Sequence, residues 1–101
     1  VYISSIGEVA KASAASGGFD ADGFVLTSYT LGQTAIVYLE GRNTALTGLT
    51  AGTRYYLSAS TPGVATATPV TGIGKRHQFL GRALGSTSLS FEADDSITLA
   101  Q

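Results

Sequence analysis

The chain has 101 residues and a formal net charge of −1, and it contains no cysteine, methionine or tryptophan. The absence of cysteine excludes a thiol nucleophile, a disulfide scaffold and cysteine-bound zinc. The near-neutral charge, with only six Lys and Arg residues, argues against a nucleic-acid-binding protein. The apolar runs are too short for a membrane-spanning helix or a signal peptide.

Length and residue pattern predict one small all-β domain. Gly, Ala, Ser and Thr make up about half of the chain, and short β-type runs alternate with Gly, Pro, Asp and Asn. No long stretch has helical periodicity. Because Val1 already lies in a strand-like run, we expect the chain to be processed or part of a longer protein. The expected strands are Val1–Ile6, Val9–Ala12, Phe24–Ser28, Thr34–Glu40, Arg54–Ala59, Val64–Thr68, His77–Leu84, Ser86–Ala93 and Ser96–Ala100.

Two stretches of the chain resemble each other, which predicts an internal repeat with pseudo-repeats 1–43 and 54–101 and a connector, 44–53. The alternative is that a β chain rich in Gly, Ala, Ser and Thr aligns loosely with itself. The matching segments are VYISSIGEVAKA with YYLSASTPGVATA, DGFVLTS with LGRALGS, and TAIVYLE with TSLSFEA. Two such halves predict a small pseudo-symmetric β-barrel or a two-layer β-sandwich, which limits exposed edges. The connector is expected to form one helical or 3₁₀ turn around Leu46 and Leu49.

Residue alternation within the strands predicts how they pack. Thr34–Glu40 is apolar on both faces, which predicts a central strand, and Gly41–Asn43 after it is expected to be a turn. In Ser86–Ala93 the apolar residues face one way and the polar residues the other, which predicts a half-buried strand. Gly23 and Gly81 occupy matching positions and predict bulges or close backbone approach.

No motif predicts catalysis. His77 and the serines would permit an acyl-transfer triad, but no G-x-S-x-G elbow is present. His77 also follows two basic residues, which disfavour its protonated form, so we interpret it as structural. The run Gly72–Lys75 is not a phosphate loop, because Pro69 and Arg76 stand where the motif needs Gly and Ser or Thr. We therefore assign no catalytic or cofactor-binding residue.

The carboxylates group in two places, Asp20 with Asp22 and Glu92 with Asp94 and Asp95. Calcium takes several oxygen ligands from a short loop, so a weak calcium site is an alternative to solvated turns. No calcium-loop pattern supports it, and we assign no metal ligand.

Four residues are candidates for contact with a ligand or partner. Tyr29 lies beside a turn and could stack on a sugar or a partner surface. Lys75, Arg76 and Arg82 could form a small basic patch for an acidic neighbour. Alternatively, they are charges on edge strands that prevent unwanted pairing.

Two longer segments resemble a module of bacteriophage virion proteins found in tail-fibre, head-decoration and head-fibre proteins. They are TALTGLTAGTRYYLSASTPGVATATPVTG (Thr44–Gly72) and FLGRALGSTSLSF (Phe79–Phe91). VYISSIGEVAKASA and the strand Thr34–Glu40 resemble the same module. The resemblance implies a non-enzymatic protein present in many copies on the virion surface, and it transfers no catalytic residue. Leu49–Tyr55 is also similar to a corner of fibronectin type III domains, but those domains carry a Trp that this chain lacks.

We therefore expect a virion structural protein, either a capsid-decorating or a fibre module, that docks by many weak protein–protein contacts. The expected partners are other virion proteins and copies of the chain, with a trimer favoured, and neither nucleic acid nor membrane. The alternative is a carbohydrate-binding module that contacts a host receptor. It would use Tyr29 together with Asp20, Asp22 or Asn43.

Overall fold

The computed structural model describes residues 1–99 and contains nine short strands and, within that range, no helix. All strand pairs are antiparallel. The prediction of an all-β fold is confirmed. The strands are β1 (Tyr2–Ile3), β2 (Val9–Ala10), β3 (Gly41–Asn43), β4 (Arg54–Leu57), β5 (Ala65–Thr66), β6 (Arg76–His77), β7 (Phe79–Ala83), β8 (Leu89–Phe91) and β9 (Ile97–Thr98).

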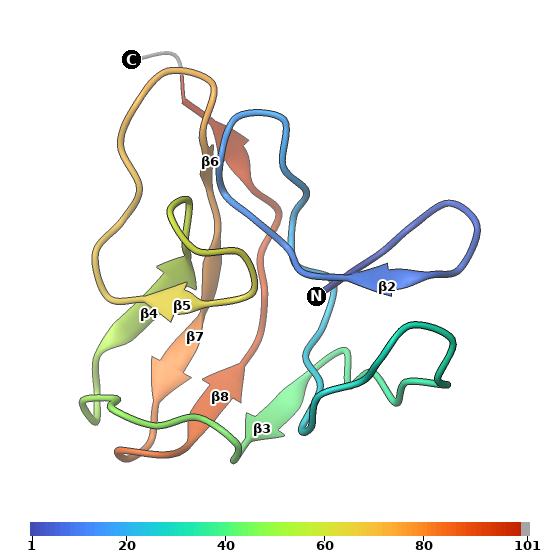
Figure 1. The fold of residues 1–101 in the computed structure, drawn as a ribbon. Helices are drawn as coiled ribbons and strands as arrows, with labels where there is room; N and C mark the ends of the chain where they lie inside the picture. The colour runs from blue at the N-terminus through green and yellow to red at the C-terminus, as the bar shows by residue number, and fades with distance from the viewer. Residues whose placement is uncertain (100–101) are drawn as a thin grey trace.

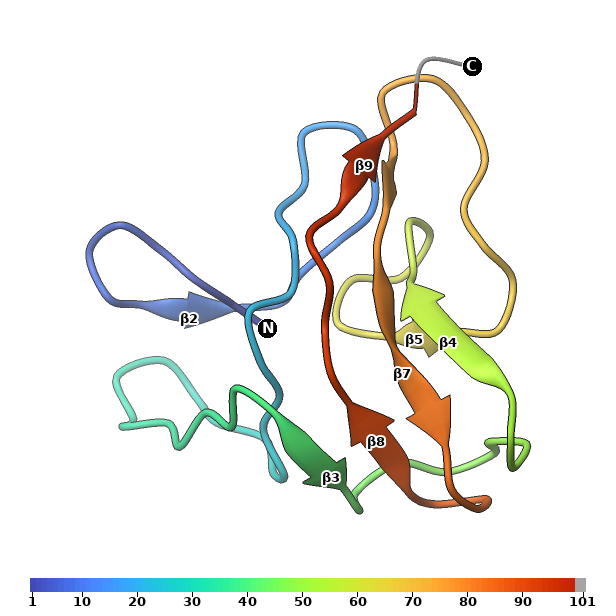
Figure 2. The same cartoon turned by 180° about the vertical axis from the view of Figure 1, so that it is seen from behind.

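The main element is a five-stranded sheet in the order β3-β8-β7-β4-β5 (Figure 1). Strands β1 and β2 form a separate hairpin, and β6 pairs with β9 at the far end of the sheet (Figure 2). The expectation of a closed barrel is wrong, because β3 and β5 are the two free edges of an open sheet. Residues 1–40 supply one hairpin, whose strands are two residues long, and one isolated bridge. This is too little strand to close the sheet into a barrel.

The core lies between the five-stranded sheet and the N-terminal segment. Leu89 and Phe91 of β8 are buried, whereas the residues between and beside them are half-buried or exposed, so the predicted alternation is confirmed. The Phe24 ring packs on Phe91 with ring centroids 5.1 Å apart. Ala12 and Ala14 are fully buried, and their small side chains let the N-terminal segment lie close to the sheet.

Two predictions for residues 34–43 are wrong. Thr34–Glu40 is not a central strand: only Tyr38 pairs, in a bridge to Phe24, and Ile36 and Leu39 are 60% and 63% exposed. Gly41–Asn43, expected as a turn, forms the edge strand β3 on β8. The apolar pattern of residues 34–40 is typical of a strand that other parts of the chain cover on both faces. In this structure no other part of the described chain covers most of the segment.

The two aligned segments of the internal repeat share specific backbone contacts. In the aligned sequences Val1 matches Tyr55 and Gly23 matches Gly81. The Val1 amino group donates to the Gly23 carbonyl oxygen at 3.0 Å, and Tyr55 lies opposite Gly81 in the β4–β7 pairing. The two hairpin turns also correspond. The Ser4 N–H donates to the backbone carbonyl oxygen of Glu8 at 2.8 Å, and the Ser58 N–H donates to the backbone carbonyl oxygen of Val64 at 3.0 Å. The Glu8 and Val64 carbonyls therefore occupy matching places in the two turns, whereas the aligned sequences match Val9 with Val64.

Gly23 and Gly81 both lie at close backbone crossings. A Cβ on Gly23 would lie 2.5 Å from the Tyr38 carbonyl oxygen, and one on Gly81 would overlap the Ser90 carbonyl oxygen. The register between β4 and β7 also shifts at Tyr55, opposite Gly81. The predicted close approach is confirmed at both glycines.

The connector, residues 44–53, is not helical, which corrects the expected helical turn. Gly48 and Gly52 have φ values of 73° and 81°, which a right-handed helix cannot contain. The segment instead bonds to its surroundings: the Thr50 N–H donates to the Tyr55 hydroxyl at 2.9 Å, and Gly52 N–H donates to the Ala83 carbonyl at 2.8 Å. The connector is therefore fixed along the base of the sheet.

Gln78 joins the N-terminal segment to the sheet. Its side chain is only 2% exposed, and its amide bonds to both the N–H and the C=O of Ala21, at 2.8 and 3.0 Å. The same amide donates to the Asp94 carbonyl oxygen at 2.9 Å. The expected last strand, 96–100, is shortened to β9, and Ala100 lies outside the described residues.

Candidate functional site

Tyr29 is half-buried within the loop between the two bridge residues, Phe24 and Tyr38. Its hydroxyl accepts a hydrogen bond from the Ile36 N–H at 3.2 Å, so the polar end of the side chain helps to shape that loop. The other residues of the carbohydrate alternative are also engaged. Asp22 accepts from the Ile3 N–H at 2.8 Å, and the buried Asn43 accepts from the Ala45 N–H at 3.0 Å.

The predicted basic patch does not assemble. Arg76 on β6 forms a salt bridge with Asp20 at 3.1 Å, and Asp20 also accepts from the Ser96 N–H at 3.3 Å. Lys75 precedes Arg76 and is half-buried against the turn at Gly72. Arg82 lies six residues beyond Arg76 along a nearly continuous strand, which is about 20 Å. The three residues therefore lie in two places.

Arg82 belongs to a different group, which we call the arginine row and define as Arg42, Arg82 and Arg54. On β8, Ser90 is the register partner of both Arg42 and Arg82, and Arg82 lies directly opposite Arg54. Register partners share a face, so the three arginines point to the outer side of the sheet, where all three are exposed. Sequence reasoning missed Arg42 and Arg54, because only the strand register shows that they join Arg82.

Aromatic side chains continue from one end of the arginine row. The Arg54 guanidinium carbon lies 4.3 Å from the centre of the Phe79 ring, a cation–π contact. Tyr56 packs on Phe79 at 6.0 Å and on His77 at 5.1 Å between ring centroids. His77 is thus half-buried beside Tyr56 at the start of the β6–β7 run, as the structural interpretation of this residue expected.

The N-terminal part of the chain exposes most of the large apolar side chains. Eight of the twelve that are exposed lie in residues 1–40, and only Phe24 of that segment contributes a large side chain to the core. Most of the eight lie on two projections that we call the apolar arms, the hairpin 2–10 and the loop 25–39. The arms extend from the same side of the sheet in both views (Figure 1, Figure 2). Ile6 is 76% exposed, and Leu31 is fully exposed.

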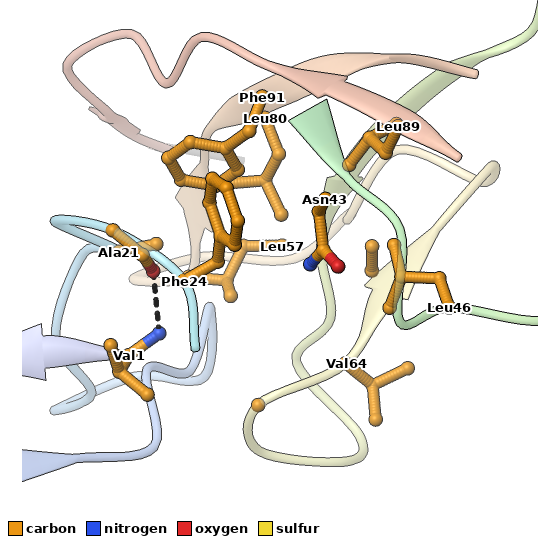
Figure 3. Close-up of a pocket in the computed structure, with 13 residues that line it drawn as sticks. Val1, Ala21, Phe24, Asn43, Leu46, Leu57, Val64, Leu80, Leu89 and Phe91 are labelled. Atoms are coloured by element: carbon orange, nitrogen blue, oxygen red, sulfur yellow. Dashed lines mark hydrogen bonds between the residues drawn. The ribbon is translucent and has the colours of Figure 1, made fainter. Parts of the chain in front are cut away.

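The cavity in Figure 3 has a volume of about 60 Å³ and lies inside the core. Phe24, Leu57, Leu80 and Phe91 point into it, and the Val1 amino group closes one side. Burial lowers the pKa of this amino group, and the nearby Asp22 carboxylate opposes that shift. The space is too small for a substrate molecule.

A larger cleft of about 280 Å³ lies between residues 58–60, which follow β4, Thr66 of β5 and the segment 68–75. Hydroxyl groups and one cation line it. The Ser58 hydroxyl already accepts from the Ser60 and Thr61 N–H groups, both at 3.2 Å, so part of this polar lining stabilises the hairpin turn. Within residues 1–99, no group of three or more His, Asp or Glu side chains could hold a metal ion.

No family model matches the chain, and neither the curated proteins nor the solved structures contain a match. In the part of the chain that the structure describes, no helix has the length and apolar character needed to cross a membrane.

Proposed function

We propose that this chain is a non-enzymatic structural module of a bacteriophage virion that docks to copies of itself and to neighbouring virion proteins through the apolar arms. The carrying observation is the distribution of exposed apolar side chains. Monomeric soluble proteins rarely present large contiguous apolar patches, and such patches mark interaction sites. Seven of the twelve exposed large apolar residues belong to the arms, whose backbones extend from the same side of the sheet (Figure 1).

Burial of the arms would contribute free energy to assembly, against the cost of immobilising one chain on another. Complete burial of one Leu or Ile side chain stabilises by about 1.5–3 kcal/mol. Ile6, Leu31, Ile36 and Leu39 are each at least 60% exposed in the single chain, so they have most of this free energy to gain. In a lattice of many copies these contacts add through multivalency. A trimer is the expected unit, as in the virion modules that the sequence resembles.

The self-association can be measured by sedimentation of the 101-residue chain over a range of concentrations. We expect a concentration-dependent oligomer, and Leu31→Ser or Ile6→Ser is expected to raise its dissociation constant about tenfold or more. Ile73→Ser is the matched control, because Ile73 is 75% exposed but lies on the loop before β6, outside the arms.

A chain that remains monomeric at every concentration would contradict the proposal. An equal effect of Ile73→Ser would contradict it as well, because association would then depend on general surface hydrophobicity. Since Leu31 is fully exposed, its replacement leaves the core unchanged, and a loss of association cannot be attributed to unfolding.

A further inference from the structure

The arginine row is an unusual feature of this chain because it concentrates like charges on one face of the sheet, with no carboxylate of the described residues in salt-bridge contact. Three of the six basic residues lie on one line across β3, β7 and β4. Like charges directly opposite each other on neighbouring strands are destabilising, and Arg54 and Arg82 are such a pair. Among residues 1–99 the only salt bridge is that of Arg76, so no carboxylate pairs with the row.

We propose that the arginine row is the binding site for an extended acidic segment of a partner protein. Guanidinium groups bind carboxylates with paired, charge-assisted hydrogen bonds, so the unpaired arginines select an anionic ligand. Glu92, two residues beyond Ser90 on the chain, is exposed and forms no salt bridge with the row. Glu40, two residues before Arg42, is likewise exposed and forms no salt bridge with the row, so the guanidinium groups are free to pair with carboxylates of another protein.

The geometry of the row fits an extended peptide. Neighbouring strands are about 4.8 Å apart, so the three strand spacings from Arg42 to Arg54 span about 14 Å. In an extended peptide, every second side chain faces the same way, at intervals of about 7 Å. Three carboxylates on alternate residues thus span about 14 Å as well. A segment of the pattern acidic-x-acidic-x-acidic, lying across the strands, places one carboxylate near each part of the row.

One arginine is held in place before any ligand arrives. The contact of Arg54 with the Phe79 ring restricts this guanidinium, which lowers the entropy that binding must remove. Phe79 is itself packed on Tyr56, so the aromatic side chains form a fixed support at one end of the row.

The charge of the molecule favours a short acidic peptide over nucleic acid. The phosphate backbone of a nucleic acid extends beyond any one binding site, and the affinity of a protein for it depends on a large basic surface. Outside the row this chain carries seven acidic residues and three further basic ones, so its remaining surface repels a long polyanion. A short segment touches only the row itself.

The test uses a fluorescein-labelled peptide of alternating glutamate and threonine, with the glutamine peptide as the uncharged control. We expect the glutamate peptide alone to bind, with an affinity that falls as salt rises from about 0.05 to 0.5 M. Arg82→Gln and Arg42→Gln are each expected to weaken binding about fivefold or more. Lys11→Gln removes the same charge from an exposed position outside the row and is expected to change binding less than twofold.

Thermal unfolding supplies a second reading. Arg82→Gln relieves the repulsion with Arg54 and is expected to raise Tm by about 1–5 °C, whereas Lys11→Gln leaves Tm unchanged. Absence of glutamate-peptide binding at low salt would overturn the proposal, as would equal losses in Lys11→Gln and Arg82→Gln. Tighter binding of short oligo-deoxythymidine than of the peptide would also overturn it. The row lies outside the apolar arms, so these results are independent of self-association.

Discussion

At the scale of single residues, the tightest constraint is the crossing of β7 and β8 at Gly81. A methyl group there would overlap a backbone carbonyl oxygen, which cannot move without breaking the pairing of the two strands. We expect Gly81→Ala to lower the free energy of unfolding by about 3 kcal/mol. Gly85→Ala is the control: it has open space for a Cβ and no positive φ, so its effect is expected to stay within about 0.5 kcal/mol. Equal urea midpoints for the two variants would contradict this assignment.

Gln78 is a second residue on which the fold depends, because it connects parts of the chain that are distant in sequence. Gln78→Leu preserves the approximate volume but leaves the backbone groups of Ala21 and the carbonyl of Asp94 without partners. Unsatisfied buried groups are costly, and we expect a loss of about 3 kcal/mol in urea unfolding. Gln33→Leu, at an exposed loop position that also accepts one backbone bond, is expected to cost less than about 0.5 kcal/mol. Similar losses in both variants would show that the burial of Gln78 is unimportant.

At the scale of strands, the sequence predicts an element well where its alternation matches its actual environment. Residues 54–57 and 89–91 have one buried and one more exposed face, and each was predicted within a strand. Residues 79–83 were also predicted within a strand, although Leu80 and Gly81 are both buried where the register with β4 shifts. Residues 34–40 show the limit of this reasoning. Their apolar pattern indicates burial, but a pattern cannot distinguish a core from a surface that a second molecule would cover.

The candidate site shows the same limit in a different form. Arg82 was identified from the sequence, but its neighbours Arg42 and Arg54 are 40 and 28 positions away along the chain. Their proximity depends on which strands pair and in which register, and a one-residue slip would turn a side chain to the other face. Gly41–Asn43 was expected to be a turn, so no strand was available to carry Arg42 into the row.

At the scale of the whole molecule, the two parts of the chain differ in how they are stabilised. The five strands β3, β8, β7, β4 and β5 form one hydrogen-bonded sheet, and this sheet supplies most of the large core residues. Residues 1–40 have one two-residue hairpin and one bridge, and isolated hairpins are marginally stable in water. The N-terminal part therefore depends on its contacts with the rest of the chain, which include those of Phe24 and Gln78 and the backbone hydrogen bonds of Ala12 and Ala14.

This difference predicts a gradient of backbone hydrogen exchange. The amides of Leu57 and Ala83, both bonded within the sheet region, are expected to exchange only through global unfolding. The amides of residues 25–37 are expected to exchange fastest, and the bridge amides of Phe24 and Tyr38 are expected to have intermediate rates.

The exchange rates of the arms should also depend on protein concentration. If the apolar arms join copies of the chain, a higher protein concentration slows exchange in the arms while the amides of β7 keep their rates. Uniform protection of the amides in the monomer would contradict the unequal stability of the two parts. Exchange rates in the arms that do not change with protein concentration would contradict assembly through the arms.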